Sequence, residues 1–277
     1  MAGKVSTVHR GGSRFYVNAE TREQVPGVTS VLSMQNKPFL VPWAAKMTAE
    51  AAVDNLRAVA SIAEYDRDGA VDFLKGASRR YTKTRAAIGS EAHDMFERMI
   101  RGESIPFVPV HMEPYYEHFS QFLDVVQPEL IRAEDIAWSD EHLYAGSFDA
   151  LLRIKDEDGT PLTVIADWKT GKGTYPDVAL QMSAYGFADR LIDPDGNSVP
   201  MPHIDAAAVL HITDEQWAFK PVRFDAEVFR HFLHLRATFD WDRDVSKTVI
   251  GKPFAKGGPS GGNAIVTGTQ RRAISPA

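Results

Sequence analysis

The hydrophobic pattern of this chain changes period near Pro128, and this change limits the possible fold more than any other feature. Before it, residues 42–65, 72–100 and 112–126 show the 3.6-residue spacing of amphipathic helices. After it, apolar and polar residues alternate as in strands at 131–138, 143–154 and 162–168. Further elements are expected in the order helix, strand, strand, helix at 176–191, 203–212, 216–221 and 226–240. Short strands at 15–17 and 28–32 are expected before the helices.

This order of elements predicts an α/β (α+β) fold, with a mixed central sheet flanked by helices and a helical N-terminal elaboration. The chain has 277 residues, enough for one large domain at about 100–200 residues per domain. We expect a single domain at 1–250, with the elaboration at 1–70 and the core at 71–245. Residues 251–277 are rich in Gly, Ser and Pro and carry basic but no acidic residues, so we expect a flexible basic tail there.

Composition excludes several kinds of site. The chain has no cysteine, which rules out disulfides, thiolate zinc sites, cysteine nucleophiles and iron–sulfur clusters. Its longest apolar stretches are far shorter than the ~20 residues that a membrane span needs, and the N-terminus lacks the apolar core of a signal peptide. We therefore expect a cytoplasmic protein with no membrane partner.

The formal net charge is −6, from 31 Lys+Arg and 37 Asp+Glu, so bulk charge would not hold the chain on nucleic acid. Residues 75–90 are an exception, because they hold five basic residues and no acid. Arg79, Arg80 and Lys83 in this run are candidate phosphate contacts. The alternative is a solvated helix face that binds nothing.

Three charged residues are expected at one edge of the sheet. Asp167 and Lys169 are two residues apart in a predicted strand, so they project to one face while Trp168 projects to the other. If Asp149 lies opposite them on the neighbouring strand, two carboxylates and an ammonium converge. Carboxylates suit Mg²⁺ or Mn²⁺, and a nearby ammonium can orient a metal-bound water for attack on a phosphodiester. The alternative is an ordinary surface ion pair.

Two helices carry further candidates. His93 and Glu97 follow Gly89 at intervals of four, which places an imidazole and a carboxylate on one helix face. Gln181 and Tyr185 are also four apart, on the helix after the Asp-x-Lys strand, where an amide and a phenol could meet a phosphate or orient the lysine. Either pair alone is weak evidence, since such residues usually have structural roles.

Taken in order, the motifs Gly89-x-x-x-His93, Gly146-x-x-Asp149, Asp167-x-Lys169-Thr170-Gly171 and Gln181-x-x-x-Tyr185 resemble the RecB-like branch of the PD-(D/E)XK nuclease superfamily. The segment PGVTSVL at 26–32, followed by Lys37-Pro38, is similar to the opening of phage-encoded exonucleases of that branch. The resemblance implies a restriction-endonuclease-like core and a Mg²⁺- or Mn²⁺-dependent DNA nuclease.

By matching position, the resemblance assigns a role to each motif residue. His93, Asp149, Asp167 and the backbone carbonyl of Trp168 would hold the metal. Lys169 would assist the nucleophilic water, with Asp149 and Asp167 the other catalytic residues. Gln181 and Tyr185 would lie near the DNA.

The chain departs from some members of the branch. It lacks the four cysteines of the iron–sulfur subfamily, and Gly171-Lys172-Gly173 does not have the spacing of a helicase phosphate loop. The resemblance favours a phage exonuclease for recombination, repair or replication, in the cytoplasm of a bacterial host. A single-strand-annealing or recombination protein is a possible partner. The alternatives are a structure-selective endonuclease and a non-catalytic DNA-binding recombination partner that keeps the fold.

Overall fold

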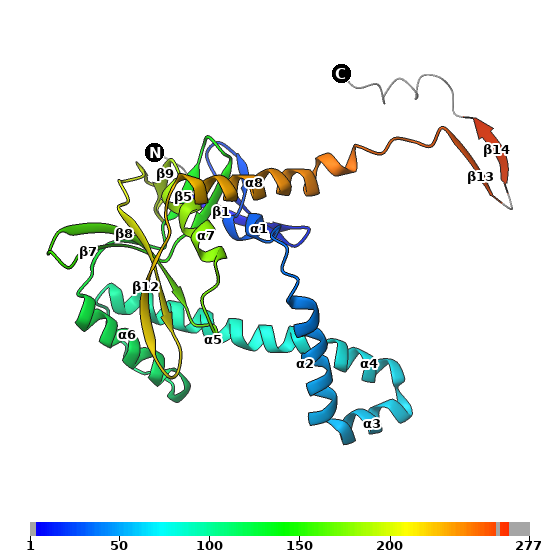
Figure 1. The fold of residues 1–277 in the computed structure, drawn as a ribbon, viewed down its shortest axis with the longest axis horizontal. Helices are drawn as coiled ribbons and strands as arrows, with labels where there is room; N and C mark the ends of the chain where they lie inside the picture. Colours follow the sequence, from blue (N-terminus) through cyan, green and yellow to red (C-terminus); the bar gives the residue numbers. More distant parts are fainter. Residues whose placement is uncertain (1–3, 259–260, 266–277) are drawn as a thin grey trace.

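The computed structural model describes residues 4–258 and 261–265 (Figure 1). Its central sheet has five strands in the order β12-β11-β8-β7-β4. Neighbouring strands are antiparallel except β8 and β11, which are parallel, so the predicted mixed sheet is confirmed. The strands are β4 (Glu129–Ala133), β7 (Ala150–Lys155), β8 (Pro161–Lys169), β11 (Ala206–Ile212) and β12 (Trp217–Val222).

Helices cover both faces of this sheet, as predicted. Alternate strand residues point to opposite sides. Leu152, Ala166 and Trp168 pack against α5 (Ala77–Ile100) and α6 (Glu113–Val126), which follows the short helix η1 (Val110–Met112). Leu151 and Ile165 pack on the other side, against α1 (Val28–Leu32), α7 (Asp177–Gly186) and α8 (Ala226–Arg243), which continues into η2 (Val245–Lys247).

Two smaller sheets lie beside the central one. The first has the order β10-β9-β5-β6, and the second has the order β1-β2-β3. A bridge between Gly27 and Ala145 links them. Their strands are β1 (Val5–Arg10), β2 (Ser13–Asn18), β3 (Gln24–Pro26), β5 (Ile136–Ser139), β6 (Tyr144–Ser147), β9 (Arg190–Ile192) and β10 (Ser198–Pro200).

The predicted strands 131–138 and 143–154 are each broken into two, which corrects the sequence analysis. β4 and β7 belong to the central sheet, whereas β5 and β6 belong to a smaller one. The breaks lie side by side, because the Glu134 N–H donates to the Asp149 carbonyl (3.3 Å) and the Phe148 N–H donates to the Asp135 carbonyl (3.3 Å). Glu134 has a left-handed backbone with φ 59°. Asp149 therefore lies in a bend between two strands, whereas the sequence analysis placed it within a strand.

The predicted strand at 28–32 is wrong, since these residues form α1. Their β-branched side chains favour strands, but tertiary packing overrides that weak preference. Val28 and Val31 are buried against the core. The Ser30 hydroxyl accepts a hydrogen bond from the Arg14 N–H (2.8 Å) and donates one to the Arg14 carbonyl (3.2 Å), which ties the helix to β2.

Only the later part of the expected elaboration at 1–70 forms an arm, which projects from the body at the lower right of Figure 1; α1, in the earlier part, packs in the core. The arm consists of α2 (Leu40–Asp54), α3 (Leu56–Tyr65) and α4 (Arg67–Lys75). The helices predicted at 42–65 and 72–100 are therefore shorter, with breaks at Asn55 and Gly76. No residue of α2 or α3 is buried, so these two helices add nothing to the core.

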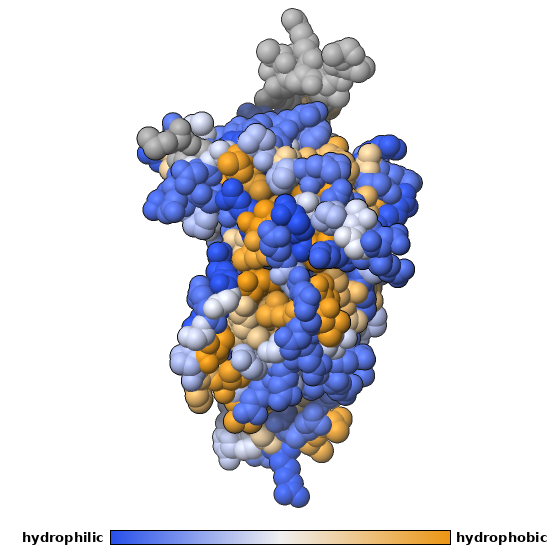
Figure 2. All heavy atoms as spheres, turned by 90° about the vertical axis from the view of Figure 1, so that its left-hand side faces the viewer, coloured by the Kyte–Doolittle hydropathy of each residue, from blue (hydrophilic) through white to orange (hydrophobic). Residues whose placement is uncertain are grey.

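Both hydrophilic and hydrophobic residues are exposed on the surface of the molecule. Figure 2 views it from the side of the β7–β8 hairpin and shows hydrophobic residues across the middle of a largely hydrophilic face. No helix within the described residues has the length and apolar character needed to cross a bilayer.

The predicted flexible tail is described only in part. The described residues include two paired strands, β13 (Ala255–Gly258) and β14 (Gly261–Ile265). The basic residues Arg271 and Arg272 lie outside the described residues.

Candidate metal and phosphodiester site

The end of β8 holds the predicted carboxylate and ammonium together. Asp167 and Lys169 project to the α7 side of the sheet and form an ion pair. Gln181 of α7 bridges them, because its Nε2 donates to Asp167 Oδ1 (3.1 Å) and its Oε1 accepts from Lys169 Nζ (3.4 Å). Trp168 projects to the opposite face, as its position between Asp167 and Lys169 predicts. The centroid of its ring lies 5.5 Å from that of Phe119.

Asp149 joins this group from the bend that precedes β7. Ala150 pairs with Ala166, and continuing that antiparallel register by one residue places Asp149 level with Asp167. The Trp168 N–H donates to Asp149 Oδ2 (2.5 Å), which fixes the carboxylate beside β8. The predicted convergence of the two aspartates and Lys169 therefore occurs, although Asp149 reaches it from a bend.

His93 approaches the same carboxylate from the other layer of the molecule. It lies on α5, and its Nδ1 is 3.4 Å from Asp149 Oδ1. Gly89, one turn earlier, lies close to the strand end, since a Cβ there would be 3.4 Å from Thr170 Oγ1. α5 therefore passes near the end of β8, and this brings the imidazole to the aspartate.

Gln181 and Tyr185 have different surroundings in the structure, although the same role was expected of both. The Tyr185 side chain is only 2% exposed and accepts a hydrogen bond from Gln181 Nε2 (3.2 Å). Tyr185 therefore orients Gln181 and does not reach a bound strand, which corrects its predicted place as a substrate contact. A Cβ on Gly146 would lie 2.6 Å from Tyr185 Cε1, so Gly146 makes room for this ring.

Burial and neighbouring charges shift the acid–base properties of the site. Burial and the Asp149 charge raise the pKa of Asp167 to about 6, against the opposing effect of Lys169. Burial alone would lower the pKa of His93, but its hydrogen bond to Asp149 and that residue's charge raise it above the ordinary value. Perturbed groups of this kind gather at functional sites more often than elsewhere.

A hollow of about 480 Å³ opens beside Asp149 and His93 and contains further acids, among them Glu97, which the sequence analysis identified, and Glu134, which it did not. Glu134 lies at the strand break, where the Ser147 hydroxyl donates to its Oε2 (3.2 Å). Burial, then the charges of Asp149 and Glu97, raise the pKa of Glu134 to about 7. Its place depends on the unpredicted break, so no sequence pattern pointed to it. The four-residue spacing from His93 did point to Glu97.

The donor atoms suit a hard divalent cation, although they do not surround one as they lie. Two carboxylates, a carbonyl and an imidazole are ligands that Mn²⁺ and, for the oxygens, Mg²⁺ accept. Asp167 Oδ2 is buried and accepts no hydrogen bond, although it contacts Lys169. Within the described ranges, no three His, Asp or Glu side chains form a cluster able to hold a metal. Asp149 points to His93 and the Trp168 N–H, while Asp167 points to Lys169 and Gln181.

The basic residues between 75 and 90 lie in different surroundings. Arg79 and Lys83 are exposed on α5. The Arg80 guanidinium lies 4.4 Å from the centre of the Phe73 ring and thus packs against α4. Arg85 lines a hollow with Tyr81, next to the end of β8. Arg79 lies about 200° around the helix from Tyr81, so the run does not form one continuous patch.

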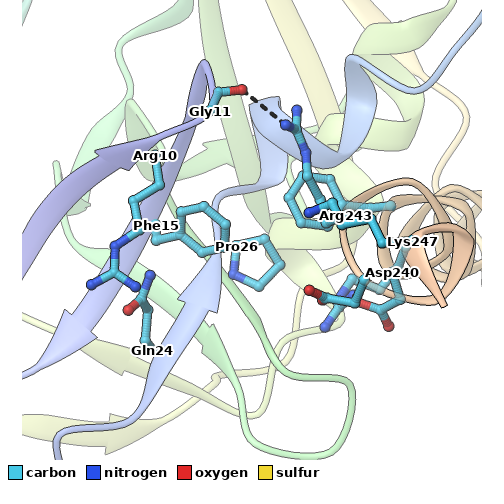
Figure 3. A pocket seen from close by; sticks show the side chains of 11 residues that line it. Arg10, Gly11, Phe15, Gln24, Pro26, Asp240, Arg243 and Lys247 are labelled. Atoms are coloured by element: carbon cyan, nitrogen blue, oxygen red, sulfur yellow. Dashed lines mark hydrogen bonds and ion pairs between the residues drawn. The ribbon is translucent and has the colours of Figure 1, made fainter.

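A second large hollow, of about 490 Å³, lies away from these residues, between β1–β3 and α8 (Figure 3). Arg10, Phe15 and Gln24 line one side of it, and Arg243 lines the other. The Arg243 guanidinium donates to the Gly11 carbonyl (2.8 Å), which joins the end of α8 to the turn between β1 and β2. None of the predicted site residues borders this hollow.

Comparison of the chain with protein-family models and with curated protein sequences found no match.

Proposed function

We propose that this chain is a metal-dependent DNA nuclease with a PD-(D/E)XK type of site, most consistent with an exonuclease. The observation that carries the proposal is the convergence of Asp149, Asp167 and Lys169 at one end of the sheet, with Gln181 hydrogen-bonded to the last two. An isolated ion pair would need neither the second carboxylate nor the partly buried amide bridge.

In this proposal, Asp149, Asp167, the Trp168 carbonyl and His93 would hold a Mg²⁺ or Mn²⁺ ion. The bound ion would lower the pKa of a water and offset the charge that develops on the phosphate. Lys169 Nζ lies next to Asp167, where it could orient that water by donating a hydrogen bond. Gln181 holds both side chains in place, and Tyr185 in turn holds Gln181.

The burial of Asp167 also contributes to this chemistry. A carboxylate buried next to a second carboxylate is costly to ionise, as its pKa of about 6 indicates. A divalent cation would relieve that repulsion, since it interacts favourably with both charges. Metal binding is therefore expected to release protons at about pH 6, which isothermal titration in two buffers of different ionisation enthalpy would measure.

The direct test is digestion of linear and covalently closed circular DNA with Mg²⁺ or Mn²⁺. An exonuclease needs an end, so it should degrade the linear DNA and leave the circle intact. Cleavage of the circle at a similar rate would favour an endonuclease. No cleavage of either DNA with either metal, together with retained DNA binding, would favour a non-catalytic binding protein.

A further inference from the structure

An aromatic groove lies at the base of the helical arm and leads to the candidate site. It consists of two adjoining hollows of about 370 and 390 Å³ that share Phe39, Leu40 and Tyr175. The first continues past Lys37 to the start of α7, and the second continues between α2 and α5 to Gly171. The groove thus connects the arm, α5 and the loop that follows Lys169.

The rings in this groove are unusually accessible. Phe39 is 53% exposed and Tyr175 is 58% exposed, and their rings are almost parallel, with centroids 6.3 Å apart. Deeper in the groove, Trp43 meets Tyr81 edge to face, with centroids 6.0 Å apart. Exposed aromatic surface that is grouped in this way marks a binding site more often than scattered exposed side chains do.

Cationic groups lie among the rings. Arg85 and Lys172 line the deeper hollow, and Lys172 Nζ lies 5.9 Å from the centre of the Tyr81 ring. Among the described residues, neither cation forms an ion pair with a carboxylate. Lys37 differs, because it pairs with Asp177 (2.8 Å) and ties the start of the arm to α7. The groove therefore combines apolar ring faces with two cations that are available to an anionic partner.

The groove and the hollow beside Asp149 are one helical turn apart along α5, because Arg85 lines the first and Gly89 the second. Tyr81, Arg85, Gly89 and His93 occur at every fourth position, so they form one stripe on the helix, about 18 Å long. Gly171 borders the groove two residues after Lys169, and the His211 ring nitrogen Nε2 donates to the Gly171 carbonyl (2.8 Å). The groove therefore approaches the candidate site from the α5 side and from the loop after Lys169.

We propose that this groove binds unpaired single-stranded DNA, with bases stacked on Phe39, Tyr175 and Tyr81 and phosphates held by Arg85 and Lys172. The proposal rests on the nuclease function proposed above and specifies the form of its substrate. Stacking on aromatic rings needs exposed base faces, which a single strand offers and an intact duplex does not. Two cations among several rings also suit a strand held largely by stacking, in a protein whose net charge is −6.

The test measures binding to a labelled thymidine oligonucleotide by fluorescence anisotropy, in EDTA so that no cleavage occurs. The main variant is Phe39→Ala combined with Tyr175→Ala. Loss of one stacked base is worth about five- to 150-fold in affinity, so we expect a weakening of at least about fivefold. Tyr175→Trp keeps a stacking surface and should bind like the wild type. Tyr65→Ala is the matched control, because Tyr65 is 90% exposed on α3, outside the groove.

Two further ligands identify what the groove recognises. An abasic strand of equal length keeps the phosphates but not the bases, and it should bind the wild type more weakly than the thymidine strand. A blunt duplex should also bind more weakly. Equal binding of the abasic strand, tighter binding of the duplex, or unchanged binding by the double variant would each overturn the proposal. Melting curves of the variants show whether they are folded.

This result is separable from that of the proposed function. Cleavage that depends on metal and Asp167, together with unchanged binding by the groove variant, would overturn the groove proposal and leave the nuclease intact. Loss of strand binding in the groove variant, with no cleavage by the wild type, would support the groove and overturn the nuclease.

Discussion

Asp167 is the residue at which burial, charge and hydrogen bonding meet most closely. It is 2% exposed and contacts Lys169 and Gln181. Asp167→Ala and Lys169→Ala should each reduce cleavage by about 100-fold or more, because both act on charge that develops in the transition state. DNA affinity should change little, since binding rests on other contacts. Single-turnover cleavage and anisotropy on the same preparations would test this, and a wild-type rate in Asp167→Ala would contradict the assignment.

Substitution of His93 tests whether the site supplies a nitrogen ligand to the metal. The His93 Nδ1 is 3.4 Å from Asp149 Oδ1, which is compatible with either a shared ion or a direct hydrogen bond. Mn²⁺ accepts a nitrogen ligand more readily than Mg²⁺, which favours oxygen. His93→Ala should therefore lose more activity with Mn²⁺ than with Mg²⁺ when each metal is saturating. Equal losses with both metals, accompanied by a lower melting temperature, would show that His93 is structural.

The raised pKa of Glu134 predicts that the stability of the fold depends on pH. This pKa is raised from 4.5 to about 7 in the folded chain, first by burial and then by Asp149 and Glu97. The folded state therefore binds the proton more tightly than the unfolded state. The stability that this confers is complete below about pH 4.5 and is lost as the pH rises through about 7.

Glu134→Gln removes the cost of the buried charge and keeps an acceptor for the Ser147 hydroxyl. Urea unfolding in EDTA should show a gain of about 1–3 kcal/mol near pH 8 and almost none near pH 4. Asp94→Asn is the matched control, because Asp94 borders the same hollow but is exposed. A gain of the same size at both pH values would rule out titration of Glu134 as its cause.

At the scale of elements, the sequence predicted the part of the site that depends on strand alternation. Asp167, Trp168 and Lys169 lie in an unbroken strand, so a period of two was sufficient to assign their faces. The breaks at Glu134 and Asp149 were missed because each arises from pairing with the other and not from a local turn signal. The helix at 28–32 was missed because its apolar β-branched residues pack against α7 and α8, which local preference does not reveal.

Substitution of Gly146 tests how closely β6 and α7 must pack against each other. An added Cβ would lie 2.6 Å from Tyr185 Cε1 and 3.0 Å from Val28 Cγ2, and the buried tyrosine cannot move aside. Gly146→Ala should therefore destabilise the fold by about 1–3 kcal/mol, measured by denaturant unfolding. It should also slow cleavage, because Tyr185 positions Gln181. Gly251→Ala, where a Cβ meets no atom within 4 Å, is the control, and equal stabilities of the two variants would contradict this account.

At the scale of the whole molecule, the acidic net charge makes the distribution of cations decisive. The sequence analysis took Arg79, Arg80 and Lys83 from the basic run at 75–90 as candidate phosphate contacts, but successive residues of a helix point to different faces. Arg85 lies on the stripe that leads to His93, whereas Arg79 and Lys83 lie on other faces of α5. Lys172 comes from a loop and was not part of that run, yet it lines the same groove as Arg85.

The salt dependence of single-strand binding distinguishes these two sets of cations. Each phosphate contact on a single strand contributes about 0.7 to the slope of log affinity against log salt. Arg85→Gln combined with Lys172→Gln should therefore lower the slope by about 1.4, whereas Arg79→Gln combined with Lys83→Gln removes the same charge and should lower it by less than half as much. Arg80 is left unchanged because it packs on Phe73, and its loss would disturb α4. The reverse order of effects would place the path of the strand on the opposite side of α5, away from the aromatic groove.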